Sequence, residues 1–196
     1  MFTGIVETIG IVTEMDGNSL SIMAEKFSKR LFIGGSVSVK GACLTITATE
    51  NEKFTVDVVD ETRRKTNLGD LKISSNVNLE LPVPVTGSFD GHIVQGHIDN
   101  TVKVVSILEE SDSEIIKFKT DHVDGKYLIK KGFVAVDGIS LTVASCDTSS
   151  FTVSVIPFTL ANTTLKDLHQ GELVNVESDI VAKYIVSLLP EGLRSL

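Results

Sequence analysis

The chain has 196 residues, a net charge of −8 and 42% hydrophobic residues, which predicts a buried core and excludes wholesale disorder. Val, Ile and Thr together supply 59 residues and Ala supplies 7, so the composition favours β-strands and excludes a helical bundle. The acidic balance argues against a nucleic-acid partner, and no apolar run reaches the ~18 residues that span a membrane. We expect no signal peptide and, with two cysteines, a reducing, cytoplasmic location.

The chain repeats itself with an offset of 97 residues. Residues 34–80 align with residues 131–177 without a gap, and about 18 of the 47 aligned positions are identical. The run VNLE at 77–80 recurs in this alignment as VNVE at 174–177. A period of this length exceeds that of solenoid repeats, so it predicts two tandem copies of one small domain.

The alignment also extends upstream of the gapless block, where Gly4 matches Gly96 with a shorter offset. The seam between the copies is expected near LPVPVTG at 81–87, since prolines interrupt strand pairing. We therefore predict a first barrel over 1–91, a second over 92–178 and a terminal helix over 179–190.

Short runs in both copies, such as 36–39 and 54–58, alternate with the period of two that is typical of strands. Polar and Gly-containing clusters interrupt them every 8–12 residues or so, the spacing of a small β-sandwich or barrel, and about six strands fit each copy. The apolar residues of 179–190 instead recur at helical spacing. This predicts a helix capped by Ser178 or Asp179, whose apolar stripe packs on its own barrel or on a neighbouring subunit.

The run GHIVQGH at 91–97 contains two histidines five residues apart. An odd separation in a strand puts His92 and His97 on opposite faces, so we do not expect them to share a metal ion. One imidazole acting as acid or base fits better, because its pKa lies near neutral pH. A histidine held only by backbone hydrogen bonds is the structural alternative. The basic run at 63–65 is expected to be a solvated loop edge.

Cys43 of the first copy aligns with Ser140 of the second, inside a shared pattern Gly-x-(Cys/Ser)-Leu-Thr. Both residues are small and able to act as nucleophiles, although the pattern also suits a tight strand start. Other polar positions have diverged, since Glu61 aligns with Phe158. The divergence indicates two similar ligands that the two copies handle unequally.

Six motifs together resemble the two-barrel riboflavin synthase family, and they cover residues 1 to about 186. They are MFTGIVE, GACLTIT, ETRRKTNLGDL, GHIVQGHID, KGFVAVDGISLTV and FTVSVIPFTLANTTL. The resemblance implies an all-β fold of two tandem six-stranded Greek-key β-barrels with a C-terminal α-helix. It also implies an enzyme without a cofactor that moves a four-carbon unit between two 6,7-dimethyl-8-ribityllumazine molecules, forming riboflavin and 5-amino-6-ribitylaminouracil.

The resemblance further implies a homotrimer whose active sites lie between the first barrel of one subunit and the second barrel of the next, with lumazine synthase as a further partner. It assigns to the first barrel the substrate-binding residues Gly4, Ile5, Val6, Ser36, Cys43, Leu44, Thr45, Asp57, Val58, Val59, Asp60, Glu61 and Thr62. It assigns to the second barrel Gly96, His97, Ile98, Lys131, Ser140, Leu141, Thr142, Ile156, Pro157, Phe158, Thr159, Leu160 and Ala161. The expected catalytic residues are His97, Ser140, Cys43 and Ser36.

Three positions depart from the pattern of the family. Lys40 replaces a usual Asn, Arg63 replaces a usual Leu, and Phe158 replaces a usual Glu or His. The last change is expected to remove a polar contact with the ribityl chain from the second barrel. A protein that binds a lumazine without converting it is the alternative function. The complete GHIVQGH run, together with Cys43 and Ser140, favours the enzyme.

Overall fold

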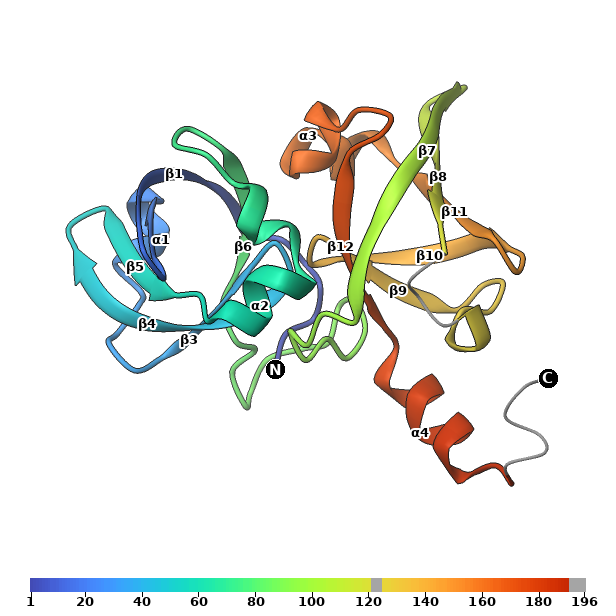
Figure 1. The fold of residues 1–196 in the computed structure, drawn as a ribbon, viewed down its shortest axis with the longest axis horizontal. Helices are drawn as coiled ribbons and strands as arrows, with labels where there is room; N and C mark the ends of the chain where they lie inside the picture. Colours follow the sequence, from blue (N-terminus) through green and yellow to red (C-terminus); the bar gives the residue numbers. More distant parts are fainter. Residues whose placement is uncertain (121–124, 191–196) are drawn as a thin grey trace.

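The structure is a computed structural model that describes residues 1–120 and 125–190, and it contains two closed barrels side by side (Figure 1). Around the first barrel the strands follow the order β1, β2, β5, β4, β3, β6. Around the second, the order β7, β8, β11, β10, β9, β12 repeats the first element by element. All pairs are antiparallel. The predicted pair of tandem six-stranded barrels is confirmed.

The strands follow one another in the same order in the two copies, with small differences in length. Those of the first barrel are β1 (Thr8–Asp16), β2 (Ser19–Met23), β3 (Ser36–Val39), β4 (Ala42–Glu50), β5 (Lys53–Asp57) and β6 (Asn76–Glu80). Those of the second are β7 (Asn100–Glu110), β8 (Ser113–Lys119), β9 (Phe133–Val136), β10 (Ile139–Cys146), β11 (Ser150–Val155) and β12 (Leu173–Ser178).

Short helices connect the strands at matching places. They are α1 (Glu25–Ser28), α2 (Asp60–Lys65) and the 3-10 helix η1 (Asn67–Asp70) in the first copy, and η2 (Gly125–Tyr127), α3 (Pro157–Asn162) and η3 (Thr164–Asp167) in the second. Each barrel encloses its own apolar cluster, built from the inward-facing residues of alternating strands. Phe54 and Phe151, aligned by the repeat, are both fully buried in these clusters.

The terminal helix α4 (Ile180–Leu188) starts at the predicted place, because the side chain of Asp179 accepts a hydrogen bond from the Val181 N–H at 2.9 Å. It contacts η2 of the second copy, while its far end projects away from both barrels (Figure 1). Its apolar residues Val181, Tyr184, Ile185 and Leu188 are 49–83% exposed. The stripe therefore does not pack on its own barrel. Within the described ranges, no helix has the length and apolar character that crossing a membrane requires.

Two hairpin turns meet where the barrels touch. Lys40 and Gly41 join β3 to β4 with φ values of +46° and +84°, and Asp137 and Gly138 join β9 to β10 with +46° and +79°. Positive φ at both central positions is the geometry of a tight two-residue hairpin turn. A Cβ atom on Gly41 would lie 2.7 Å from the backbone nitrogen of Gly138, and the reverse also holds. Both glycines are therefore required, because the two turns pack tip to tip.

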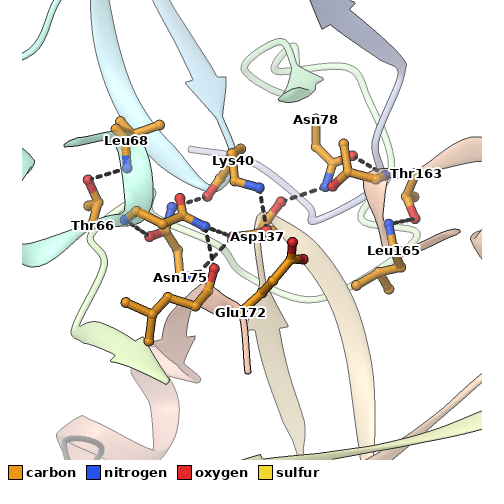
Figure 2. A network of polar contacts seen from close by, with 12 residues as sticks. Lys40, Thr66, Leu68, Asn78, Asp137, Thr163, Leu165, Glu172 and Asn175 are labelled. Carbon is orange, nitrogen blue, oxygen red and sulfur yellow. Dashed lines mark hydrogen bonds and ion pairs between the residues drawn. The ribbon is translucent and has the colours of Figure 1, made fainter. Parts of the chain in front are cut away.

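A buried polar network surrounds these turns (Figure 2). The Lys40 ammonium donates to the Asp137 carboxylate at 2.6 Å, and the two side chains are 12% and 2% exposed. The same carboxylate accepts the Asn175 N–H at 2.8 Å and the Asn67 amide at 3.0 Å. Asn78 and Asn175, aligned by the repeat, donate to the backbone carbonyls of Asp137 and Lys40. The network thus fixes how one barrel sits against the other.

We expect Asp137→Asn to lower the free energy of unfolding by about 3 kcal/mol, because the Lys40 charge would remain buried without its counter-charge. Urea denaturation measures the loss. Lys53→Met, which removes the more exposed Lys53–Glu14 pair, serves as the control and should cost less than about 1 kcal/mol. Equal losses in the two variants would contradict this role of the junction.

Candidate functional site

Two stretches that precede the first strand of each barrel, residues 2–6 and 94–98, are here called the leading segments. They pair with each other between the barrels, because the Phe2 N–H donates to the Val94 carbonyl at 2.7 Å and the Val94 N–H donates back at 3.1 Å. Phe2, Val94 and Ala135 form a small buried cluster there. Each leading segment is thereby held at the boundary between the two barrels.

The leading segments cross over, so that each reaches the barrel to which it does not belong. Ser140 of the second barrel donates its N–H to the Gly4 carbonyl at 2.7 Å, and Cys43 of the first donates to the Gly96 carbonyl at 2.9 Å. Val6 packs against the core of the second barrel and Ile98 against that of the first. The expectation that Gly4–Val6 line the pocket of the first barrel and 96–98 that of the second was wrong, because the assignment is exchanged.

Glycine is needed at both crossing points. Gly4 and Gly96 have φ values of +78° and +83°, a backbone conformation that disfavours residues with a Cβ atom. A Cβ atom would also lie 2.7 Å from the Cβ of Ser140 or 2.5 Å from that of Cys43. The GIVE and GHID motifs therefore share a glycine for a steric reason.

The crossing creates a cavity of about 210 Å³ beside Cys43. Helix α2 closes one side of it with Glu61, Thr62 and Lys65, and the leading segment closes the other with His97. A thiol, an imidazole, a carboxylate and an ammonium thus surround one small space. We call it the Cys43 pocket.

The equivalent place in the second barrel contains Ser140, and we call it the Ser140 site. The Ser140 hydroxyl lies 2.7 Å from Nδ1 of His92. Phe133 stacks on the His92 ring, with centroids 5.2 Å apart and planes at 8°. Burial lowers the pKa of His92, and the negative charge of Asp179 opposes this only in part. The result is a neutral imidazole hydrogen-bonded to a serine hydroxyl.

Buried carboxylates hold both leading segments. Glu80, at the end of β6, accepts the N–H groups of Thr3 at 2.6 Å and Gly4 at 3.0 Å. Glu177, at the end of β12, accepts the N–H groups of residues 95, 96 and 97 at 2.7–3.0 Å. Burial raises the pKa of both carboxyls, that of Glu177 to about 7, while the N–H donors act in the opposite direction.

The remaining predicted residues differ in how they can reach a ligand. The side chains of Leu44, Val58 and Leu141 are buried in the barrel cores, so only their backbone groups can contribute. Half-buried at the surface are Thr159 and Leu160. Exposed at the surface are Ile5, Ser36, Thr45, Asp57, Val59, Asp60, Lys131, Thr142, Ile156, Pro157, Phe158 and Ala161.

Larger cavities lie elsewhere. One of about 490 Å³ runs along β1, β2 and α1 beside the Arg30–Glu7 ion pair, and one of about 380 Å³ adjoins Lys40 and Asp137 between the barrels. The residues that line them include no predicted site residue. In the described ranges, no three His, Cys, Asp or Glu side chains gather as they would around a metal ion.

Sequence reasoning missed four residues of this region: His92 as the partner of Ser140, Phe133, Glu80 and Glu177. His92 was noticed only as one of two histidines in the run at 91–97. The two glutamates carried a usable signal, because they occupy aligned positions in VNLE and VNVE. An acidic residue that recurs at the end of a buried strand indicates a shared structural task.

Comparison with known sequences places the chain among well-described relatives. A family model described as "Lumazine binding domain" matches it twice, over residues 3–82 and 95–179. Riboflavin synthase of Actinobacillus pleuropneumoniae is 42% identical over 193 residues, covering 96% of this chain and 90% of the relative. Riboflavin synthase of Bacillus subtilis (strain 168) is 38% identical over 193 residues, which again cover 96% of this chain and 90% of the relative. That of Schizosaccharomyces pombe is 37% identical over 197 residues, covering 96% and 94%.

Solved structures share the fold. LumP complexed with riboflavin matches with a TM-score of 0.83 at 24% identity, and the match covers 91% of this chain and 99% of that chain. LumP complexed with 6,7-dimethyl-8-(1'-D-ribityl) lumazine matches with a TM-score of 0.81 at 23% identity and the same coverage. At these identities the likeness extends to the fold.

We predict that His92 titrates below its ordinary pKa of about 6.5, because its buried site disfavours the imidazolium. The unfolded chain then binds this proton at a higher pH than the folded chain does, so His92 destabilises the fold as the pH falls through about 6.5. A pH titration of the His92 imidazole by NMR measures the midpoint. A midpoint at or above 6.5 would show that the site is not desolvated.

Proposed function

The chain belongs to the riboflavin synthase family, and we propose that it converts two molecules of 6,7-dimethyl-8-ribityllumazine into riboflavin and 5-amino-6-ribitylaminouracil. A four-carbon unit moves from one substrate molecule to the other, so the enzyme is a transferase. The two products together hold the atoms of the two substrates. The reaction therefore balances without an oxidant or reductant.

The proposal rests on one observation: a single chain contains two sites that are built in the same way. At each of them a leading-segment glycine carbonyl accepts a hydrogen bond from the residue at the start of a strand, Cys43 or Ser140. A reaction between two identical molecules needs two binding sites of similar shape. It also needs them to differ in chemistry, because one molecule gives the four-carbon unit and the other receives it.

The Ser140 site supplies a proton acceptor. The neutral His92 imidazole lies 2.7 Å from the Ser140 hydroxyl, so it can take a proton through that hydroxyl from a bound molecule. We assign this pair to the proton removed from the acidic 7-methyl group of one lumazine. Stacking on Phe133 keeps the His92 ring in a fixed orientation, which favours the transfer.

The Cys43 pocket supplies polar groups of both charges. Glu61 suits the hydroxyls of a ribityl chain, since a carboxylate accepts several hydrogen bonds. His97 lines the same pocket as Cys43, and we assign to it a second proton transfer. The second barrel has Phe158 in the place of Glu61, 73% exposed on α3. We infer that the two sites hold the ribityl chain with different strength.

We further propose that the active site is completed by a second copy of the chain, with α4 as the contact that builds a homotrimer. Exposed apolar residues support this assembly at the start of α3 (Ile156 and Phe158) and on the stripe of α4. We propose the cytoplasm as its location, since both thiols are free. Lumazine synthase is the enzyme we propose to supply the substrate.

Incubation of the protein with 6,7-dimethyl-8-ribityllumazine tests the reaction. Riboflavin fluorescence should appear together with an equal amount of the uracil product. The alternative is a protein that binds a lumazine without converting it, as the fold shared with LumP would permit. It predicts saturable binding with no product, and that outcome would overturn the proposed reaction.

We expect His97→Gln to lower the single-turnover rate by about 10²- to 10⁴-fold, the usual contribution of a general acid or base. Substrate affinity should change little, because Gln still forms hydrogen bonds. Cys43→Ser is the matched control in the same pocket, and we expect it to keep most of the rate, since serine already fills this position in the second barrel. A wild-type single-turnover rate in His97→Gln would show that His97 is not a general acid or base.

We expect removal of residues 180–196 to convert the oligomer to monomers while the barrels stay folded, because the exposed apolar stripe of α4 would be lost. Sedimentation gives the mass, and circular dichroism gives the fold. Leu188→Asp, which places one charge on the same stripe, should have the same effect in the full-length chain. An unchanged oligomer mass in both variants would show that α4 is not the contact.

A further inference from the structure

The repeat places one glutamate at the same position of each copy, and the reaction assigns no role to either. Glu80 is the last residue of β6 and Glu177 is the last but one of β12. They are 5% and 2% exposed, respectively. Burying a carboxylate disfavours its charged form, so such a residue is kept in a core only where several donors satisfy it.

Backbone N–H groups of the leading segments are those donors. Glu80 accepts the Thr3 N–H and hydroxyl at 2.6 and 2.8 Å and the Gly4 N–H at 3.0 Å. Glu177 accepts three consecutive N–H groups, those of Gln95, Gly96 and His97. A carboxylate can accept three such bonds at once, whereas a glutamine offers one acceptor oxygen and would turn its NH₂ group toward N–H donors. Each leading segment is thus held at a fixed position by one side chain.

The effect of each glutamate is transmitted to the other barrel. Glu80 belongs to the first barrel, but the Gly4 that it holds accepts its hydrogen bond from Ser140. Glu177 belongs to the second barrel, but it holds Gly96, whose carbonyl accepts a hydrogen bond from the Cys43 N–H of the first barrel. The adjacent His97 lines the Cys43 pocket. The clearance is small, since a Cβ atom at Gly96 would lie 2.5 Å from the Cβ of Cys43. A shift of the leading segment therefore changes the pocket beside it.

We propose that Glu80 and Glu177 are positioning residues that act crosswise: Glu177 of the second barrel shapes the Cys43 pocket of the first, and Glu80 of the first barrel shapes the Ser140 site of the second. A purely structural role would have the opposite signature, because loss of a buried group harms first the barrel that contains it. The part of the proposal that concerns ligands rests on the proposed function. The part that concerns the geometry of the pockets does not.

The test compares Glu177→Gln with Glu80→Gln in the full chain, each variant being the matched control of the other. Riboflavin is the probe, and NMR follows the imidazole signals of His97 for the Cys43 pocket and His92 for the Ser140 site. We expect Glu177→Gln to raise at least 10-fold the riboflavin concentration at which the His97 signal is half-shifted. The corresponding concentration for the His92 signal should stay within 2-fold of wild type. Glu80→Gln should give the reverse pattern.

A second measurement needs no ligand. Alkylation of Cys43 by iodoacetamide, followed by mass spectrometry of its peptide, should become several-fold faster in Glu177→Gln and stay unchanged in Glu80→Gln. Cys146 of the second barrel is the internal reference. If either glutamine variant does not fold, Gly96→Ala and Gly4→Ala displace the same segments and should reproduce the pattern at His97 and His92, respectively.

The outcomes separate the two proposals. Effects of each variant confined to its own barrel, equal effects at both imidazoles, or Cys43 alkylation that is identical in the two variants would overturn the crosswise role. A wild-type protein in which riboflavin moves neither imidazole would instead overturn the proposed function. In that case the alkylation rates still decide whether Glu177 positions the segment beside Cys43.

Discussion

The buried ion pair between Lys40 and Asp137 is the contact on which the remaining geometry depends. It lies where two glycine-containing turns touch, and those turns lead directly into β4 and β10, whose second residues are Cys43 and Ser140. Because Asp137 also accepts hydrogen bonds from Asn67 and Asn78 of the first barrel, neither barrel can rotate against the other without breaking several buried polar contacts. The relative position of the two sites follows from this junction.

One backbone design thus presents two different sets of side chains. The crossing leading segments and the carboxylates that hold them occur in both copies, whereas the residues that face a ligand have diverged. A thiol, an imidazole and a carboxylate meet in the Cys43 pocket, and a serine with a buried neutral imidazole stands at the Ser140 site. Such a division suits a reaction in which two equal molecules take unequal parts, because the shared frame aligns them and the side chains distinguish them.

Local sequence signals predicted strands and α4, because alternation, turn residues and the Asp179 cap act over a few residues, whereas the pair of barrels was predicted from the repeat and the family resemblance. The crossing was predicted the wrong way round, since it joins Gly4 to Ser140 across the junction of the barrels and no local pattern reports such a contact. The pairing of His92 with Ser140 spans 48 positions and was missed for the same reason. Aligned residues such as Glu80 and Glu177 indicate a shared task, but their partners become visible only once the fold is known.

The Lys40–Asp137 pair also affects which barrels can pair with each other. If two isolated first barrels met in the same way, Lys40 would face another Lys40, and two second barrels would bring Asp137 against Asp137. Like charges at a buried contact repel, so this contact favours the pairing of unlike barrels over that of like ones. Covalent fusion supplies them in equal numbers and at high effective concentration. A tandem gene product can therefore exclude self-pairing of its halves with one pair of charges.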